Sequence, residues 1–229
     1  MEPTTSDIPG AAGAMATHGV ARTLNPEAGD HAVTADPVEL AAAERAIRRS
    51  YARFPYYGRR YAARGRRFSA SDSGWLVTLC DLPPAQAPAQ VLWLAGVLAS
   101  RGMPRWLLEC HLLELHEELV AARPGREARY APLRACAQVL AERRRRHLSD
   151  DDLAQLDAEF EARVPADEAR RLPHTGAMLG AATTDEREGV DGAVASLAYW
   201  LVDAERFGPE WIAAVHETLA EARARADQR

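Results

Sequence analysis

The chain has 229 residues, a formal net charge of -5 and three cysteines, and all 28 of its basic side chains are arginine. An odd number of cysteines with no CxxC pair argues against a disulfide framework. No apolar run approaches the ~18 residues of a membrane-spanning helix, and the N-terminus does not have the pattern of a secretory signal. These features favour a cytoplasmic protein without a membrane span.

The N-terminal 35 residues are rich in Gly, Ala, Pro and Thr and show little periodicity. This composition predicts a disordered tail over 1–35. A helix is expected to begin after Asp36, which is a suitable N-cap, with Glu39 at the capping-box position. Pro55 should end or kink this helix. A second helical piece should then end near Gly65, because glycine favours helix C-termini.

Apolar residues at helical spacing predict further helices along the rest of the chain. These cover approximately 72–82, 87–101, 104–120, 130–148, 149–161, 167–181, 187–206 and 209–225. Ser149 is a suitable N-cap for the fifth of them. No segment has a strand pattern. The sequence therefore predicts an all-α multi-helix bundle of about eight or nine helices, in one domain over 36–229.

A Pro-x-Trp-x4-His pattern occurs twice, at Pro104, Trp106 and His111 and again at Pro209, Trp211 and His216. The three pairs of positions are all separated by the same number of residues. The pattern indicates an internal duplication of a helical unit of about 100 residues, with halves at 36–122 and 123–229. The alternative is chance recurrence of a helix start that bears Trp. In either case both tryptophans are expected to be core anchors.

The segment from Arg45 to Arg67 holds nine arginines, five aromatic residues and no carboxylate. Arginine binds carboxylates and phosphates bidentately, and tyrosine stacks on flat ligands. The candidate ligand-binding residues are Tyr57, Arg59, Arg60, Tyr61, Arg64 and Arg67. The alternative is that these arginines dock the segment on the chain's own acidic helices, such as 149–161.

The two histidines of the repeated pattern form a second candidate site. If the duplication is real, His111 and His216 could face one another and ligate a haem iron or another metal, with Trp106 and Trp211 beside them. The competing interpretation is that each histidine packs at the edge of an apolar face and is hydrogen-bonded there. His111 and Glu114 share a helical face, but no second helix supplies a matching pair, so no metal site is predicted from this spacing.

Two classes of function follow from these candidate sites. The leading hypothesis is a non-enzymatic binding or regulatory module that recruits a protein partner or an anionic ligand through residues 51–67, with nucleic acid less favoured. The alternative is a cofactor-binding helical protein or enzyme centred on His111 and His216. There is no nucleophile elbow and no phosphate-binding loop, so the sequence assigns neither a reaction nor a cofactor. Apolar residues on two sides of helix 104–120 are compatible with a homo-oligomer.

Overall fold

The computed structural model describes residues 18–83 and 85–228, which form ten α-helices and two short strands. The all-α class is therefore confirmed, with slightly more helices than predicted. The helices are α1 (Pro37–Arg53), α2 (Tyr56–Thr78), α3 (Gln86–Ala99), α4 (Arg105–Ala122), α5 (Glu127–Arg145), α6 (Asp150–Arg163), α7 (Ala166–Arg171), α8 (Thr175–Arg187), α9 (Ala193–Leu201) and α10 (Pro209–Ala226). No helix in this part of the chain is long and apolar enough to cross a membrane.

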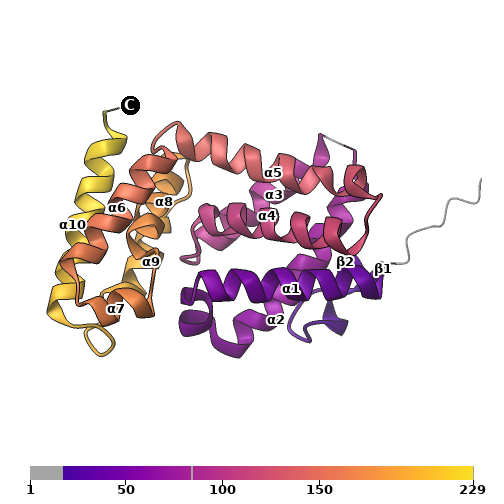
Figure 1. Cartoon of the computed structure of the whole chain (residues 1–229), viewed down its shortest axis with the longest axis horizontal. Coiled ribbons are helices and arrows are strands. Elements are labelled where there is room, and N and C mark those ends of the chain that lie inside the picture. The colour runs from indigo at the N-terminus through magenta and orange to yellow at the C-terminus, as the bar shows by residue number, and fades with distance from the viewer. Residues whose placement is uncertain (1–17, 84, 229) are drawn as a thin grey trace, which may run out of the picture.

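The helices form two groups that lie side by side (Figure 1). In the N-terminal group α4 packs against both α1 and α5, and in the C-terminal group α6, α8 and α10 pack together. The expected boundary at residue 122 falls between α4 and α5, within the first group. The two helices that carry the repeated pattern, α4 and α10, also differ in how they connect to the preceding helix, because α3 and α4 are joined by 100–104 whereas α9 and α10 are joined by 202–208. The internal duplication stays a prediction.

Two main apolar cores hold these groups. The first lies between α1, α2, α3, α4 and α5 and consists mainly of leucine and alanine. The second includes Phe54, Tyr56 and Tyr57 together with Leu107 and Trp211. Phe54, which precedes α2, and Tyr56 and Tyr57 in its first turn are therefore buried against the C-terminal group. Burial of these large rings removes apolar surface from water and so joins the two groups of helices.

Helix starts follow local capping chemistry where the sequence supplies it. Ser149 and Asp152 form a complete capping box at α6, and Asp36 Oδ1 accepts a hydrogen bond of 2.8 Å from the Val38 N–H at α1. Glu39 does not complete a box at α1, although it stands at the expected position. Its carboxylate is buried and accepts hydrogen bonds from Tyr130 Oη at 2.8 Å and from other donors instead. A tertiary contact has replaced the local one.

The prediction of a disordered tail over 1–35 is wrong for the part of it that the structure describes, which begins at residue 18. His18–Val20 (β1) and Ala32–Thr34 (β2) pair as a small antiparallel hairpin. This hairpin packs on α2 at Gly74, where an added Cβ would lie 3.2 Å from Val33. The absence of a larger side chain at position 74 lets the hairpin approach the helix. Residues 1–17, also part of the predicted tail, lie outside the described residues.

The predicted helix end at Gly65 is also wrong. The α2 span consists of two helical arms that meet at Ala62, with φ 49° and ψ -146°, and Gly65 lies inside the second arm. Gly65 is needed inside the helix, since a Cβ there would lie 2.4 Å from Tyr61 Cβ. A non-glycine residue rarely adopts the backbone conformation of Ala62, because its Cβ meets the backbone. The bend is therefore imposed by packing on both of its sides.

The late helices are shorter than predicted. The expected weak helix over 167–181 is divided into α7 and α8, and the expected helix over 187–206 is reduced to α9. Gly189 and Gly192 have φ values of +85° and +72° before α9. These left-handed conformations suit glycine and end helical geometry there.

Candidate ligand-binding site

A cavity of about 640 Å³ lies within the N-terminal group of helices. Both arms of the bent helix α2 line it, together with α1, α3, α4 and the turn between α3 and α4. Most of its wall is aromatic or aliphatic. The apolar lining residues are Ile47, Tyr51, Tyr57, Tyr61, Phe68, Leu76, Leu94, Leu98, Met103 and Leu108. This volume is within the range of small-molecule pockets.

Arg60 closes one side of the cavity through contacts with neutral oxygens. Its Nη2 donates to the carbonyl oxygen of Ser196 at 2.7 Å, and its Nη1 donates to Tyr56 Oη at 2.6 Å. Gly102 has φ +82°, and an added Cβ there would lie 2.5 Å from the Arg60 guanidinium. Tyr61 Oη adds a hydrogen bond of 3.0 Å to the Arg101 carbonyl oxygen. These bonds fix the first arm of α2 to the α3–α4 turn and to α9.

Two arginines that line the cavity have no carboxylate within ion-pair distance among the described residues. Arg60 is surrounded by carbonyl and hydroxyl oxygens, and the Arg101 side chain has no described hydrogen-bond acceptor. Other arginines of the segment differ from them. Arg64 and Arg67 bind Glu27, each at 2.6 Å, and Arg66 binds Glu44. Arg64, Arg66 and Arg67 are therefore paired with carboxylates of the chain itself, whereas Arg60 and Arg101 have none within ion-pair distance among the described residues.

A single carboxylate, Asp72, also lines the cavity. Burial raises its pKa to about 6, while the positive charge of Arg101 and a hydrogen bond with Ser71 oppose that rise. The raised pKa means that burial destabilises the charged carboxylate by more than Arg101 and Ser71 stabilise it. Asp72 thus offsets part of the positive charge of Arg101 at neutral pH and loses this effect at mildly acidic pH.

The polar part of the cavity wall is centred on His111. Its Nδ1 lies 2.8 Å from Ser50 Oγ, and its Nε2 lies 2.9 Å from Ser73 Oγ. Burial lowers the pKa of His111 to about 4, because the charged imidazolium would lose its hydration. The ring is therefore neutral at physiological pH. Ser50, Ser73 and His111 come from α1, α2 and α4, and all three line the cavity.

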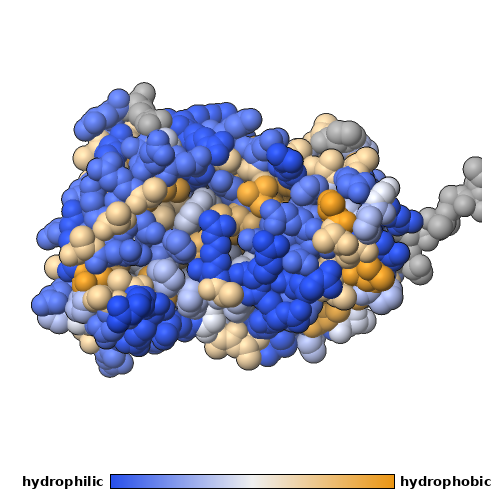
Figure 2. Space-filling view, in the orientation of Figure 1, coloured by the Kyte–Doolittle hydropathy of each residue, from blue (hydrophilic) through white to orange (hydrophobic). Residues whose placement is uncertain are grey.

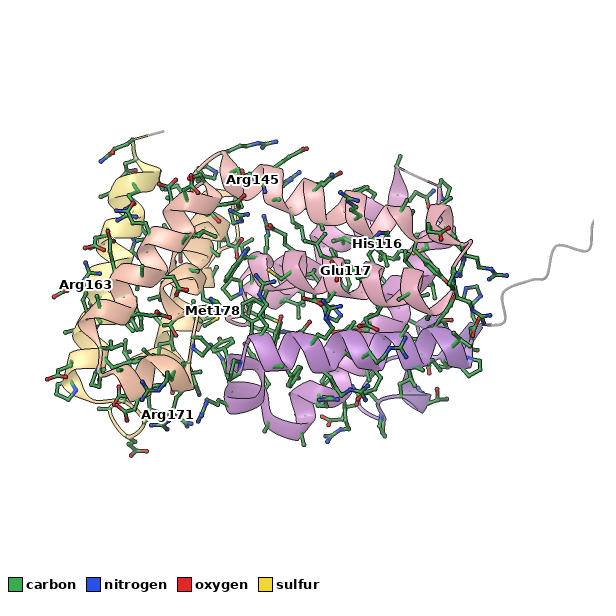
Figure 3. The ribbon with its side chains drawn as sticks, in the orientation of Figure 1. His116, Glu117, Arg145, Arg163, Arg171 and Met178 are labelled. Carbon is green, nitrogen blue, oxygen red and sulfur yellow. The ribbon has the colours of Figure 1, made fainter. Side chains whose placement is uncertain are left out.

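The structure brings four of the six predicted ligand-binding residues to this cavity, namely Tyr57, Arg60, Tyr61 and Arg64. The other two lie elsewhere. Arg67 is held by Glu27. Arg59 lines a smaller cavity of about 400 Å³ and donates from Nε to the Arg171 carbonyl oxygen at 3.1 Å. Arg171 lies at the lower end of the C-terminal group (Figure 3).

The expected docking of the segment on helix 149–161 is not what the structure shows. The acidic residues of α6 contact other arginines, since Asp150 binds Arg144 and Arg145 and Glu159 binds Arg225. Arg145 is at the junction of α5 and α6 (Figure 3). The ion pairs of segment 51–67 go to Glu27 and Glu44 instead. Internal docking of these arginines therefore occurs, with partners near the N-terminus.

The candidate histidine pair is not brought together around the cavity. His111 lines it, while His216 is exposed on α10, which contributes no residue to its wall. Trp106 is partly buried beside Phe54, with ring centroids 5.3 Å apart. Trp211 is fully buried and donates from Nε1 to the Leu201 carbonyl oxygen at 3.1 Å. Within the described residues no group of three or more His, Cys, Asp or Glu side chains could hold a metal ion.

Sequence reasoning missed five polar residues of the cavity: Ser50, Ser69, Asp72, Ser73 and Arg101. The three serines lie far from His111 in the chain and carry no spacing signal that connects them to it. Asp72 stands at the start of the helix expected over 72–82, a place where such a residue usually caps the helix. Arg101 stands outside the arginine-rich segment. Only the assembled helices show that these side chains share one cavity.

Comparisons with protein-family models, with curated protein sequences and with solved structures gave no significant match. The face shown in Figure 2 is largely hydrophilic, with small groups of apolar residues between the charged ones. The cavity is therefore the feature of the protein from which a function can be inferred.

Proposed function

We propose that this protein binds a small organic anion with an apolar body in the cavity bounded by α1, α2, α3 and α4. One observation carries the proposal: Arg60 and Arg101 line the cavity with no carboxylate within ion-pair distance among the described residues, and the rest of the wall is mainly aromatic and aliphatic. A site with an apolar wall and a few convergent polar groups is typical of small-molecule binding.

Electrostatics favours an anion over a neutral or cationic ligand. Arg60, Arg64 and Arg101 line the cavity together with one carboxylate, Asp72, and of the three arginines Arg64 is paired with Glu27. The Arg101 guanidinium has donors free to bind a carboxylate, sulfonate or phosphate bidentately. Such charge-assisted bonds typically contribute about 1.5–3 kcal/mol each. The aromatic and aliphatic residues would remove the ligand's apolar body from water.

The other functions expected from the sequence have less support. A protein-docking role for segment 51–67 would need free arginines, but Arg64, Arg66 and Arg67 already hold Glu27 and Glu44. A cofactor held between His111 and His216 would need the two rings to meet at one site. His111 instead has a serine hydroxyl at each ring nitrogen.

Isothermal titration calorimetry with octanoate and 1-octanol at pH 7 tests the proposal. Octanoate should bind more tightly than the neutral alcohol of the same chain length. Arg101→Gln should weaken octanoate binding about tenfold or more, which corresponds to at least ~1.4 kcal/mol. The matched control is Arg126→Gln, since Arg126 is an exposed arginine in the α4–α5 turn without a described side-chain partner. Equal binding of acid and alcohol, or an unchanged affinity in Arg101→Gln, would overturn the proposal.

A further inference from the structure

The serine, histidine and serine at the cavity wall form a continuous hydrogen-bonded chain. Ser50 Oγ lies 2.8 Å from His111 Nδ1, and Ser73 Oγ lies 2.9 Å from His111 Nε2. Neither serine hydroxyl has another hydrogen-bond partner among the described residues. Both serines are almost fully buried, with 4% and 1% of their surface exposed. The chain is thus fixed by three helices and borders the cavity.

The hydroxyl hydrogens of the two serines and the N–H of neutral His111 exceed by one the hydrogen bonds within this chain. A neutral imidazole has one N–H donor and one acceptor nitrogen, so it accepts from one serine and donates to the other. The serine that donates to the ring uses its hydroxyl hydrogen. The serine that accepts from the ring keeps a hydrogen with no acceptor among the described residues. In one tautomer of His111 this free donor is on Ser73, and in the other tautomer it is on Ser50.

A buried donor without an acceptor is costly, and native structures usually satisfy it. Here the three residues line a cavity that can hold a ligand. We propose that the Ser50–His111–Ser73 chain is a subsite that donates a hydrogen bond to an uncharged oxygen of the ligand, such as a ketone, ester or ether oxygen. This inference rests on the proposed function and narrows it, because the ligand is now an organic acid that also carries an uncharged oxygen, such as that of a ketone.

The neutrality of His111 suits this role better than proton abstraction does. No carboxylate contacts either ring nitrogen among the described residues, since both are occupied by serines. A general base that activates serine usually has a third group to stabilise its charged form. Here burial lowers the pKa of His111 to about 4, which makes it a weak base. The chain therefore binds and orients an acceptor group.

The experiment compares octanoate with its 4-, 5-, 6- and 7-oxo derivatives by calorimetry. At least one ketone position should bind about fivefold more tightly than octanoate, which is the ratio that one neutral hydrogen bond of ~1 kcal/mol gives. Ser50→Ala or Ser73→Ala, whichever removes the serine that holds the free hydrogen, should abolish the preference for the oxo acid over octanoate within that variant, and a preference that survives in both variants would contradict the subsite. Ser69→Ala is the matched control, because Ser69 lines the same cavity and contacts Tyr51 Oη instead of His111.

Imidazole ¹⁵N shifts of His111 supply a readout that does not need the anion site. The oxo acid, and the neutral ketone 2-octanone, should change the balance between the two His111 tautomers, whereas octanoate should not. If no oxo acid binds more tightly than octanoate and neither ketone perturbs His111, the inference is overturned even when octanoate binds normally. If octanoate fails to bind but 2-octanone perturbs His111, the anion proposal fails and the subsite stands as a site for neutral ketones.

Discussion

Arg144 on α5 holds Glu109 on α4 through two hydrogen bonds, Nη2 to Oε1 at 3.0 Å and Nε to Oε2 at 3.1 Å. The same guanidinium binds Asp150 at the start of α6 at 2.6 Å. Only 5% of the Arg144 side chain is exposed. This arginine therefore connects the last two helices of the N-terminal group to the first helix of the C-terminal group.

Removal of Glu109 should destabilise the protein strongly. Glu109→Ala leaves the buried Arg144 guanidinium with fewer partners, and loss of one member of a buried ion pair typically costs about 3–5 kcal/mol. Asp150 remains, so we expect about 3 kcal/mol in urea denaturation. The control is Asp30→Ala, which breaks the exposed Arg22–Asp30 pair and should cost less than ~1 kcal/mol. Similar losses in the two variants would show that Arg144 is not a structural connection between the groups.

Ala62→Gly should stabilise the protein. Ala62 has φ 49° and ψ -146°, a conformation that costs a non-glycine residue about 1–3 kcal/mol. Glycine removes this strain but adds chain entropy to the unfolded state, so the expected net gain is about 1 kcal/mol. Ala63→Gly is the matched control, because Ala63 is exposed and helical and glycine there should cost about 0.5–1 kcal/mol. Thermal and urea unfolding measure both changes, and a loss of stability in Ala62→Gly would contradict the strained bend.

Asp185 should make the protein less stable as pH rises through the neutral range. Its carboxylate is buried on α8 and accepts a hydrogen bond of 2.9 Å from the Arg105 N–H at the start of α4. Burial raises its pKa to about 7 from an ordinary value of 3.8, against the opposing effects of Arg105. The folded state thus binds this proton more tightly than the unfolded state does. Its stabilising contribution is full below about pH 4 and is lost as pH rises to about 7.

Asp185→Asn provides the test of this pH dependence. Asparagine keeps an oxygen that can accept from the Arg105 N–H but cannot titrate. The difference in unfolding free energy between wild type and variant should change in favour of the variant between pH 4 and pH 7. A difference that stays constant over this range would contradict a raised pKa. The comparison is made between the two proteins because Asp72 and His111 also titrate in or near this range.

Asp72 should make anion binding stronger at mildly acidic pH. Its pKa is raised to about 6, so between pH 7.5 and pH 5.5 it loses much of the negative charge that opposes an anion in the cavity. The other charged residues of the cavity wall are Arg60, Arg64 and Arg101, which stay cationic, and His111 stays neutral. Octanesulfonate is the suitable ligand, since its own charge does not change over this range.

Calorimetry should give a severalfold higher affinity for octanesulfonate at pH 5.5 than at pH 7.5. Asp72→Asn should bind with the higher affinity at both values. Equal affinities of the wild type at the two pH values would place the ligand away from Asp72. A stronger pH dependence in Asp72→Asn would show that another group in the cavity controls binding.

The sequence by itself determined most of the helices, because their signals are local. Periodic apolar residues and capping residues such as Ser149 act within one turn or a few turns of the chain. For this reason α4, α6 and α10 were predicted close to their observed bounds. The arginine- and tyrosine-rich segment was also visible, and four of its six candidate residues line the cavity.

Tertiary structure alone decided the bend at Ala62, the hairpin over 18–34 and the composition of the cavity. The bend places alanine in a conformation that local preferences oppose, so packing of the two arms of α2 must supply the free energy. The chain of Ser50, His111 and Ser73 joins three helices. No local pattern records such a contact, because its hydrogen bonds form only when burial brings distant segments together.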